Sequence, residues 1–137
     1  MQSRLHPYLN FDGNTREVME FYHSIFGGKL NFSTYKDYGA SQDPSDDDKI
    51  MHSQLEGDNG ITLMAADALR HMEYRPGNTI AMSLHGDNHE ELAAYFDKLA
   101  AGGTIQQPLT AAPWGDTFGS LIDKYGVEWL VNITAQR

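Results

Sequence analysis

Residues 14–26, NTREVMEFYHSIF, and residues 88–100, NHEELAAYFDKLA, share one design that decides the fold. Each stretch opens with an asparagine that can cap a helix and places a glutamate three residues later. Apolar side chains then recur at helical spacing. They are Val18, Phe21, Tyr22, Ile25 and Phe26 in the first stretch, and Leu92, Tyr95, Phe96, Leu99 and Ala100 in the second. The sequence therefore predicts two equivalent amphipathic helices.

The segments around these helices repeat as well. Gly27-Gly28 follows the first helix and Gly102-Gly103 the second, as a left-handed helix end requires. One β-prone run precedes each helix and three follow it. These runs are residues 5–11, 30–35, 50–56 and 61–65 in the first half, and 79–84, 104–105, 118–123 and 128–133 in the second.

This repetition predicts an α+β fold made of two βαβββ modules within a single domain, residues 1–137. The modules cover about residues 1–67 and 79–137, and residues 67–78 form the linker. One helix can cover only one face of a small sheet. We therefore expect the other faces to form a curved mixed sheet around a shared cavity, where a ligand would bind.

Composition excludes several classes of protein. The chain has 137 residues and no cysteine, which rules out disulfides, thiolate nucleophiles and cysteine-based metal sites. Its net charge of -9, with scattered basic residues, argues against a nucleic-acid partner. Neither a signal region nor an apolar stretch of about 20 residues is present. We therefore expect a cytoplasmic protein without a membrane segment.

Several strings resemble those of PhnB-like proteins, also labelled demethylubiquinone methyltransferase-like, in the vicinal oxygen chelate superfamily of glyoxalases, bleomycin-resistance proteins and dioxygenases. The strings are PYLNFDGN (7–14), FY (21–22), FGG (26–28), WGDTFG (114–119) and DKYGVEW (123–129). The resemblance implies a glyoxalase/bleomycin resistance-like fold of paired modules, a homodimer and a ligand cavity. A methyltransferase would ordinarily need a glycine-rich turn after a strand, whereas both glycine pairs follow helices.

The resemblance also implies where metal ligands would lie, on the first and fourth strands of each module. These positions are His6, Thr62, Thr79 and Leu130. Only the histidine is a usual metal ligand, so the sequence favours no cofactor. The alternative is a divalent metal held by a non-standard set, His6, His52, Glu56 and Glu128.

Strand alternation and the aromatic residues of the WGDTFG string predict the ligand-binding residues. They are His6, Tyr8, Asn10, His52, Gln54, Thr62, Met64, Trp114 and Phe118. The candidates for catalysis are His52, Glu56 and Asp116, because a carboxylate beside an imidazole can form an acid-base pair. By contrast, we expect Trp129 in the core and His85 in a solvated connection.

The sequence thus favours a homodimer that binds a small organic molecule and lacks the standard metal site of its superfamily. One alternative is a metal-dependent lyase, isomerase or dioxygenase-type enzyme with the non-standard ligand set, or an enzyme using His52 without metal. A third hypothesis is a partner protein that makes contact through residues 41–49. The acidic run within that segment, Asp43, Asp46, Asp47 and Asp48, is expected to be solvated.

Overall fold

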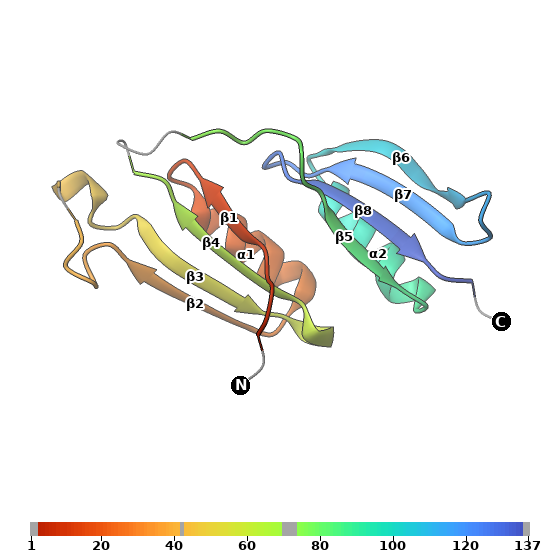
Figure 1. The fold of residues 1–137 in the computed structure, drawn as a ribbon, viewed down its shortest axis with the longest axis horizontal. Coiled ribbons are helices and arrows are strands. Elements are labelled where there is room, and N and C mark those ends of the chain that lie inside the picture. The colour runs from red at the N-terminus through yellow and green to blue at the C-terminus, as the bar shows by residue number, and fades with distance from the viewer. Residues whose placement is uncertain (1–2, 42, 70–73, 136–137) are drawn as a thin grey trace. The chain divides into compact units, whose positions relative to one another are not determined.

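A computed structural model describes residues 3–41, 43–69 and 74–135 of the chain. The chain divides into two compact units, Met1–Pro76 and Gly77–Arg137. Each unit has the element order strand, helix and three strands (Figure 1). In the described part of the chain, neither helix is long and apolar enough to cross a bilayer.

The first unit is a four-stranded mixed sheet covered by one helix. Its elements are β1 (Tyr8–Phe11), α1 (Thr15–Phe26), β2 (Lys29–Thr34), β3 (Ile50–Glu56) and β4 (Thr62–Asp67). The strand order is β1-β4-β3-β2, with β1 parallel to β4 and the other pairs antiparallel. Short 3₁₀ turns, η1 (Pro44–Asp46) and η2 (Asp58–Gly60), lie in the connections.

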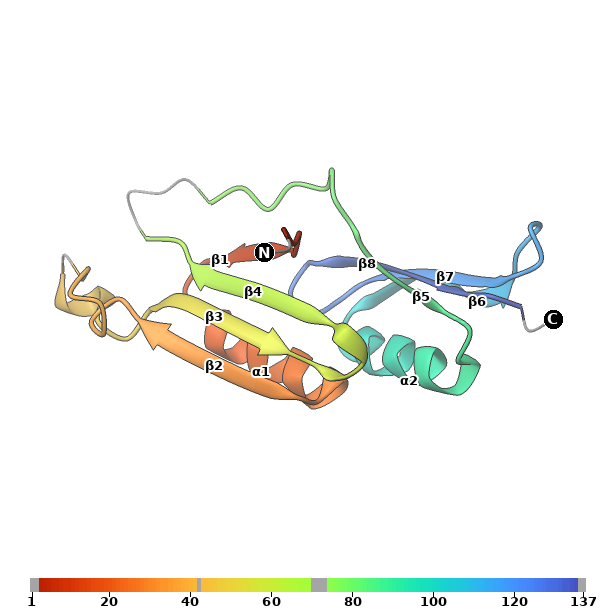
Figure 2. The same cartoon turned by 60° about the horizontal axis from the view of Figure 1, so that its bottom comes forward.

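The second unit repeats this topology. Its elements are β5 (Met82–Gly86), α2 (His89–Ala100), β6 (Thr104–Ala111), β7 (Thr117–Ile122) and β8 (Glu128–Ile133). The order is β5-β8-β7-β6, again with one parallel pair, β5 and β8. Figure 2 shows each helix lying along one face of its own sheet. The prediction of an α+β fold built from two βαβββ modules is confirmed.

The buried stripe of each helix forms the core against its sheet. In α2 the buried residues are Leu92, Tyr95, Phe96 and Leu99, as predicted. In α1 they are Thr15, Val18, Met19, Tyr22, Ile25 and Phe26. Met19 is fully buried, whereas Phe21, which was expected in the stripe, is half-buried. The stripe of α1 is therefore rotated slightly from the predicted one.

The two helices begin in different ways. The side chain of Asn88 accepts the backbone N–H of Glu91 at 3.1 Å, as the sequence predicts. Asn14 makes no such bond. The carboxylate of Asp67, at the end of β4, instead accepts the N–H of Thr15 at 3.0 Å and that of Ile50 at 2.8 Å.

Asp67 is therefore a structural residue, and the prediction that it begins the linker is wrong. It is 3% exposed, because β4 continues two residues beyond its predicted end and carries the side chain inside the unit. Residues 70–73 of the predicted linker lie outside the described residues.

The strand bounds agree with the sequence at β3 and β8 and differ elsewhere. β1 and β5 begin at Tyr8 and Met82, three residues later than predicted. β6 has eight residues instead of two. It includes Pro108, which lacks the N–H of a central strand but is tolerated at the edge of a sheet, where β6 lies. The glutamines and the proline in its sequence, TIQQPLTA, hid the strand.

The glycines after the helices allow the backbone to pass closely. Gly27 and Gly102 have φ values of 67° and 76°, as the predicted helix ends require. The next residue in each case, Gly28 or Gly103, must be a glycine because a side chain there would overlap the nearby backbone. A Cβ on Gly28 would lie 2.0 Å from a carbonyl oxygen of β3, and a Cβ on Gly103 would lie 2.3 Å from that of Ile122.

We predict that Gly103→Ala lowers the free energy of unfolding by about 1–3 kcal/mol, because the added methyl overlaps backbone that cannot move aside cheaply. The matched control is Gly86→Ala, whose Cβ would meet the Leu92 side chain at an ordinary 3.6 Å. Urea denaturation measures both variants. Equal midpoints for the two would show that the close approach does not matter.

A second prediction concerns the buried carboxylate. Asp67→Asn replaces one acceptor oxygen with an NH₂ group facing a backbone N–H, and should cost about 2 kcal/mol of stability. Asp48→Asn, at an exposed position, serves as the control and should change stability by less than about 0.5 kcal/mol. Thermal unfolding at neutral pH measures the difference, and an unchanged Tm in Asp67→Asn would contradict the assigned role.

Candidate functional site

The face of the first sheet that turns away from α1 carries most of the predicted ligand-binding residues. Strand register places Tyr8, Met64, Gln54 and Asn31 in one row across β1, β4, β3 and β2. By alternation, Asn10, His52, Glu56 and Thr62 lie on the same face. The intervening residues on the helix side, Ser53, Leu55, Leu63 and Ala65, are buried. We call the uncovered side the first open face.

Tyr8 is a hydrogen-bond donor at one end of this face. Its hydroxyl donates to the carbonyl of Met51 at 3.4 Å, and its ring centroid lies 6.1 Å from that of His52. Burial raises the pKa of Tyr8, so the phenol stays protonated at neutral pH. The side chain is nevertheless 46% exposed, which leaves the ring within reach of a ligand.

A bulge in β3 changes one expected contact. The pairing of β2 with β3 shifts by one residue between Ser33 and Thr34, which leaves Met51 as the extra residue. Alternation along residues 50–56 predicts that Met51 faces the helix, but Met51 is only half-buried. Ile50, which is 1% exposed, is buried there instead.

The candidate catalytic residues are not brought together by β3. His52 and Glu56 share a face, but four residues of extended strand separate them by about 13 Å. Glu56 accepts a hydrogen bond from Gln54 at 3.0 Å. Asp116, in the second unit, accepts from the side chain of Asn132 and from the backbone N–H of Ala135, both at 3.0 Å. This spacing argues against an acid-base pair of His52 with Glu56, and the alternative pair of His52 with Asp116 stays a prediction.

The same spacing bears on the non-standard metal set. Metal ligands lie about 2.0–2.3 Å from a zinc ion, so a strand separation of about 13 Å does not favour His52 and Glu56 as ligands of one ion. Within residues 3–41, 43–69 and 74–135, no group of three or more His, Asp or Glu side chains is placed to bind a metal. His6 is half-buried and precedes β1, and Thr79 precedes β5.

Backbone hydrogen bonds also reveal which positions of the two units correspond. In the turn before β4, the N–H of Gly57 donates to the carbonyl of Ile61. In the turn before β8, the N–H of Asp123 donates to the carbonyl of Val127. The first residues of β4 and β8, Thr62 and Glu128, are therefore equivalent. The positions that the family resemblance implies on these strands are Thr62 and Leu130, and Leu130 lies two residues farther along its strand than the equivalent of Thr62.

The second sheet has an open face of different character, which we call the second open face. Register places His85, Asn132, Phe118 and Thr110 in one row across β5, β8, β7 and β6. His85 is exposed on this face, although it was expected in a connection. β5 runs two residues past its predicted end, and the alternation of His85 with buried Leu84 was the signal available in the sequence.

Trp114 stands on the second open face in a fixed orientation. Its indole N–H donates to the side-chain oxygen of Asn132 at 3.1 Å, and the amide of Asn132 donates to Asp116 at 3.0 Å. The ring meets that of Phe118 edge to face, with centroids 5.6 Å apart. Trp114 is nevertheless 58% exposed. These four residues are called the Trp114 platform.

The other tryptophan has a structural role. Trp129 is 2% exposed, which confirms its predicted place in the core. Its indole N–H donates to Asp123 at 2.9 Å, and the other oxygen of Asp123 accepts the backbone N–H groups of Tyr125 and Val127. The DKYGVEW string therefore forms a turn that the side chain of its first residue, Asp123, stabilises through hydrogen bonds.

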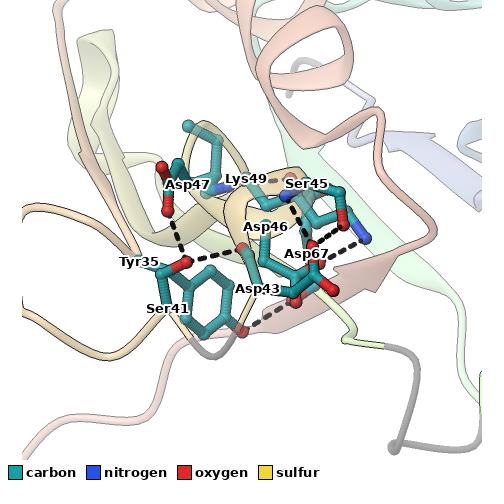
Figure 3. Close-up of polar contacts among 9 residues, drawn as sticks. Tyr35, Ser41, Asp43, Ser45, Asp46, Asp47, Lys49 and Asp67 are labelled. Carbon is teal, nitrogen blue, oxygen red and sulfur yellow. Dashed lines mark hydrogen bonds and ion pairs between the residues drawn. The ribbon is translucent and has the colours of Figure 1, made fainter.

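The acidic run is an ordered segment tied to the sheet (Figure 3). Asp43 caps η1, and the hydroxyl of Ser41 donates to Asp47 at 2.5 Å. Asp46 is 5% exposed and forms an ion pair with Lys49 at 3.0 Å. The expectation of a solvated run is therefore wrong at Asp46, which folds inward beside its own lysine.

Tyr35 connects this segment to the buried carboxylate residue (Figure 3). Its hydroxyl donates to the backbone carbonyl of Asp67 at 2.9 Å, and its N–H donates to the carbonyl of Lys49 at 3.0 Å. Burial raises the pKa of Tyr35, and the nearby Tyr8, Asp67 and Asp46 raise it further. The tyrosine therefore remains a donor at neutral pH.

Comparison with known proteins finds similarity over nearly the whole chain. A family model described as 3-demethylubiquinone-9 3-methyltransferase matches residues 3–132. Protein YjdN of Escherichia coli K12 is 28% identical over 151 residues, covering 97% of each chain. The crystal structure of protein PA1353 from Pseudomonas aeruginosa has a TM-score of 0.82 at 36% identity, covering 98% of this chain and 100% of that one.

Two further structures resemble the chain. A putative 3-demethylubiquinone-9 3-methyltransferase, PhnB protein, from Bacillus cereus has a TM-score of 0.74 at 28% identity, covering 96% of this chain and 100% of that one. A glyoxylase/bleomycin resistance protein/dioxygenase domain from Frankia sp. EAN1pec has a TM-score of 0.63 at 11% identity and covers 99% and 94%. The second likeness concerns the fold alone.

Proposed function

The chain belongs to the 3-demethylubiquinone-9 3-methyltransferase family, which is the PhnB-like family of the glyoxalase-like superfamily, and we propose that it binds a small organic molecule. The observation that carries this proposal is the first open face. It presents Tyr8, Asn10, Gln54 and Thr62 as uncharged hydrogen-bonding groups beside the apolar side chain of Met64. Such a mixture suits a polar, mostly uncharged ligand.

The family's name is a weaker guide to activity than the site, because one fold hosts many functions. Methyl transfer from adenosylmethionine would ordinarily require a strand followed by a glycine-rich turn. β1 is followed by Asp12-Gly13-Asn14 and β5 by Asp87-Asn88, so within the described residues neither strand before a helix has such a turn. The proposal is therefore binding without a resident cofactor.

The same proposal includes assembly and location. We infer a homodimer from the family resemblance, and a cytoplasmic location agrees with a chain that has no cysteine. Size-exclusion chromatography with light scattering measures the assembly. A monomer at micromolar concentration would remove the homodimer from the proposal and leave ligand binding to be tested separately.

Binding is tested by thermal shift with a library of small, uncharged organic compounds. A ligand present at about 100 times its Kd should stabilise the protein by about 2.7 kcal/mol. Elemental analysis of the purified protein accompanies the screen. Near-stoichiometric zinc, nickel, manganese or iron that disappears in His6→Ala would overturn the proposed absence of a resident cofactor and favour the metal-dependent alternative.

For a compound found in this way, His52→Ala should raise Kd about tenfold, through loss of a hydrogen bond worth about 1.4 kcal/mol. His89→Ala is the matched control, because His89 is exposed at the start of α2 and lies off the open face. Isothermal titration calorimetry measures both. If His52→Ala leaves Kd unchanged, the ligand does not use this part of the first open face.

A further inference from the structure

We propose that the Trp114 platform is a stacking site for flat aromatic cations. The inference goes beyond the proposed function, because it concerns the second open face and a different class of ligand. It begins from the exposure of Trp114. Its indole N–H is already satisfied by Asn132 at 3.1 Å, so the 58% of the side chain that remains exposed offers chiefly ring surface.

The ring is held in place before any ligand arrives. Asn132 is itself fixed, because its amide donates to Asp116 at 3.0 Å. The other oxygen of Asp116 accepts the N–H of Ala135 at 3.0 Å, and the backbone N–H of Ala112 closes the loop on the Asp116 carbonyl at 2.8 Å. A ring fixed in this way binds without the entropy cost of ordering a free side chain.

Phe118 supplies a second aromatic surface at a steep angle. The planes of the two rings meet at 68°, with 5.6 Å between their centroids. A flat ligand stacked parallel to the indole would lie at the same steep angle to the phenyl ring, which is a favourable aromatic geometry. Bulky saturated ligands cannot make both contacts closely. The corner formed by the two rings thus selects flat molecules.

Charge selects cations among flat molecules. The carboxylate of Asp116 is one hydrogen-bonded residue away from the indole, and an indole face itself attracts cations. Among residues 77–135, the lysines are Lys98 on α2 and Lys124 in the turn between β7 and β8, away from the platform. The net charge of the chain, -9, also attracts cations, over a longer range.

The row that contains Asn132 and Phe118 of the platform also provides a polar partner. His85 is paired in register with Asn132 and is exposed on the same face. Its imidazole can donate to or accept from a substituent on the ligand ring. The ring system and charge are thus recognised by Trp114, Phe118 and Asp116, and substituents by His85.

The two tryptophans make the first test direct. Trp129 is 2% exposed and Trp114 is 58% exposed, so acrylamide should quench mainly the fluorescence of Trp114. Accessible Trp114 in the native assembly supports a free platform. A protein in which acrylamide quenches neither tryptophan would have Trp114 covered by another chain, which overturns the proposal.

Ligand class is then tested by calorimetry with three probes. They are 1-methylquinolinium, a flat cation; naphthalene-2-sulfonate, a flat anion; and trimethylcyclohexylammonium, a cation that is not flat. We expect measurable binding of 1-methylquinolinium and at least tenfold weaker binding of the others. Equal binding of the anion would overturn the charge argument, and equal binding of the saturated cation would overturn the stacking argument.

Variants assign the binding to the platform. Trp114→Leu should weaken binding of 1-methylquinolinium at least tenfold, and Asp116→Asn, which keeps an acceptor for Asn132, should weaken it about threefold to tenfold. Tyr38→Leu, at a residue that is 60% exposed in the first unit, is the control. An unchanged Kd in Trp114→Leu with a native Tm would overturn the proposal.

The outcomes separate this inference from the proposed function. A library compound whose binding depends on His52 but not on Trp114, together with no binding of 1-methylquinolinium, refutes the platform and leaves the proposed function standing. Binding of 1-methylquinolinium that depends on Trp114, without any library compound that requires His52, supports the platform and refutes the role of the first open face.

Discussion

One helix cannot cover both faces of a four-stranded sheet, and every candidate site in this protein follows from that constraint. In the first unit α1 buries Leu55 and Leu63, while their neighbours along the strands turn to the uncovered side. The second unit repeats the arrangement with α2. Because side chains alternate along each strand, one set packs against the helix and stabilises the fold, and the other set is exposed to other molecules. The open faces are thus a direct product of the βαβββ topology.

The duplicated modules differ in the chemistry of these open faces. The first presents hydrogen-bonding groups around Tyr8 and Gln54, whereas the second presents the fixed aromatic corner of Trp114 and Phe118. Some positions with structural roles agree. Gly28 and Gly103 approach the backbone of the turns before β4 and β8, and these two turns close with equivalent N–H to carbonyl bonds. The modules thus share these turns while their exposed side chains differ in chemistry.

The sequence predicts best what depends on neighbours along the chain. Helical spacing locates both helices, and alternation assigns the facing of residues such as Gln54 and Thr62, because these patterns are local. It fails where a contact joins distant positions. The bond from Asp67 to Thr15 spans 52 residues, and that from Trp114 to Asn132 spans 18. Strand ends are equally hard to predict from sequence, because the pattern places His85 in a connection and makes the edge strand β6 too short.

The different starts of α1 and α2 have a consequence for how the chain folds. Asn88 caps α2 across 3 residues, so this helix can be stabilised while the rest of the chain is still unfolded. The corresponding bond of α1 forms only when Asp67 at the end of β4 reaches Thr15, 52 residues away along the chain, and closing that long loop costs entropy. We expect φ-values to be higher at Asn88 than at Asp67. Two helices of equal length and equivalent place in their modules would then join the folding pathway at different times, the second in sequence before the first.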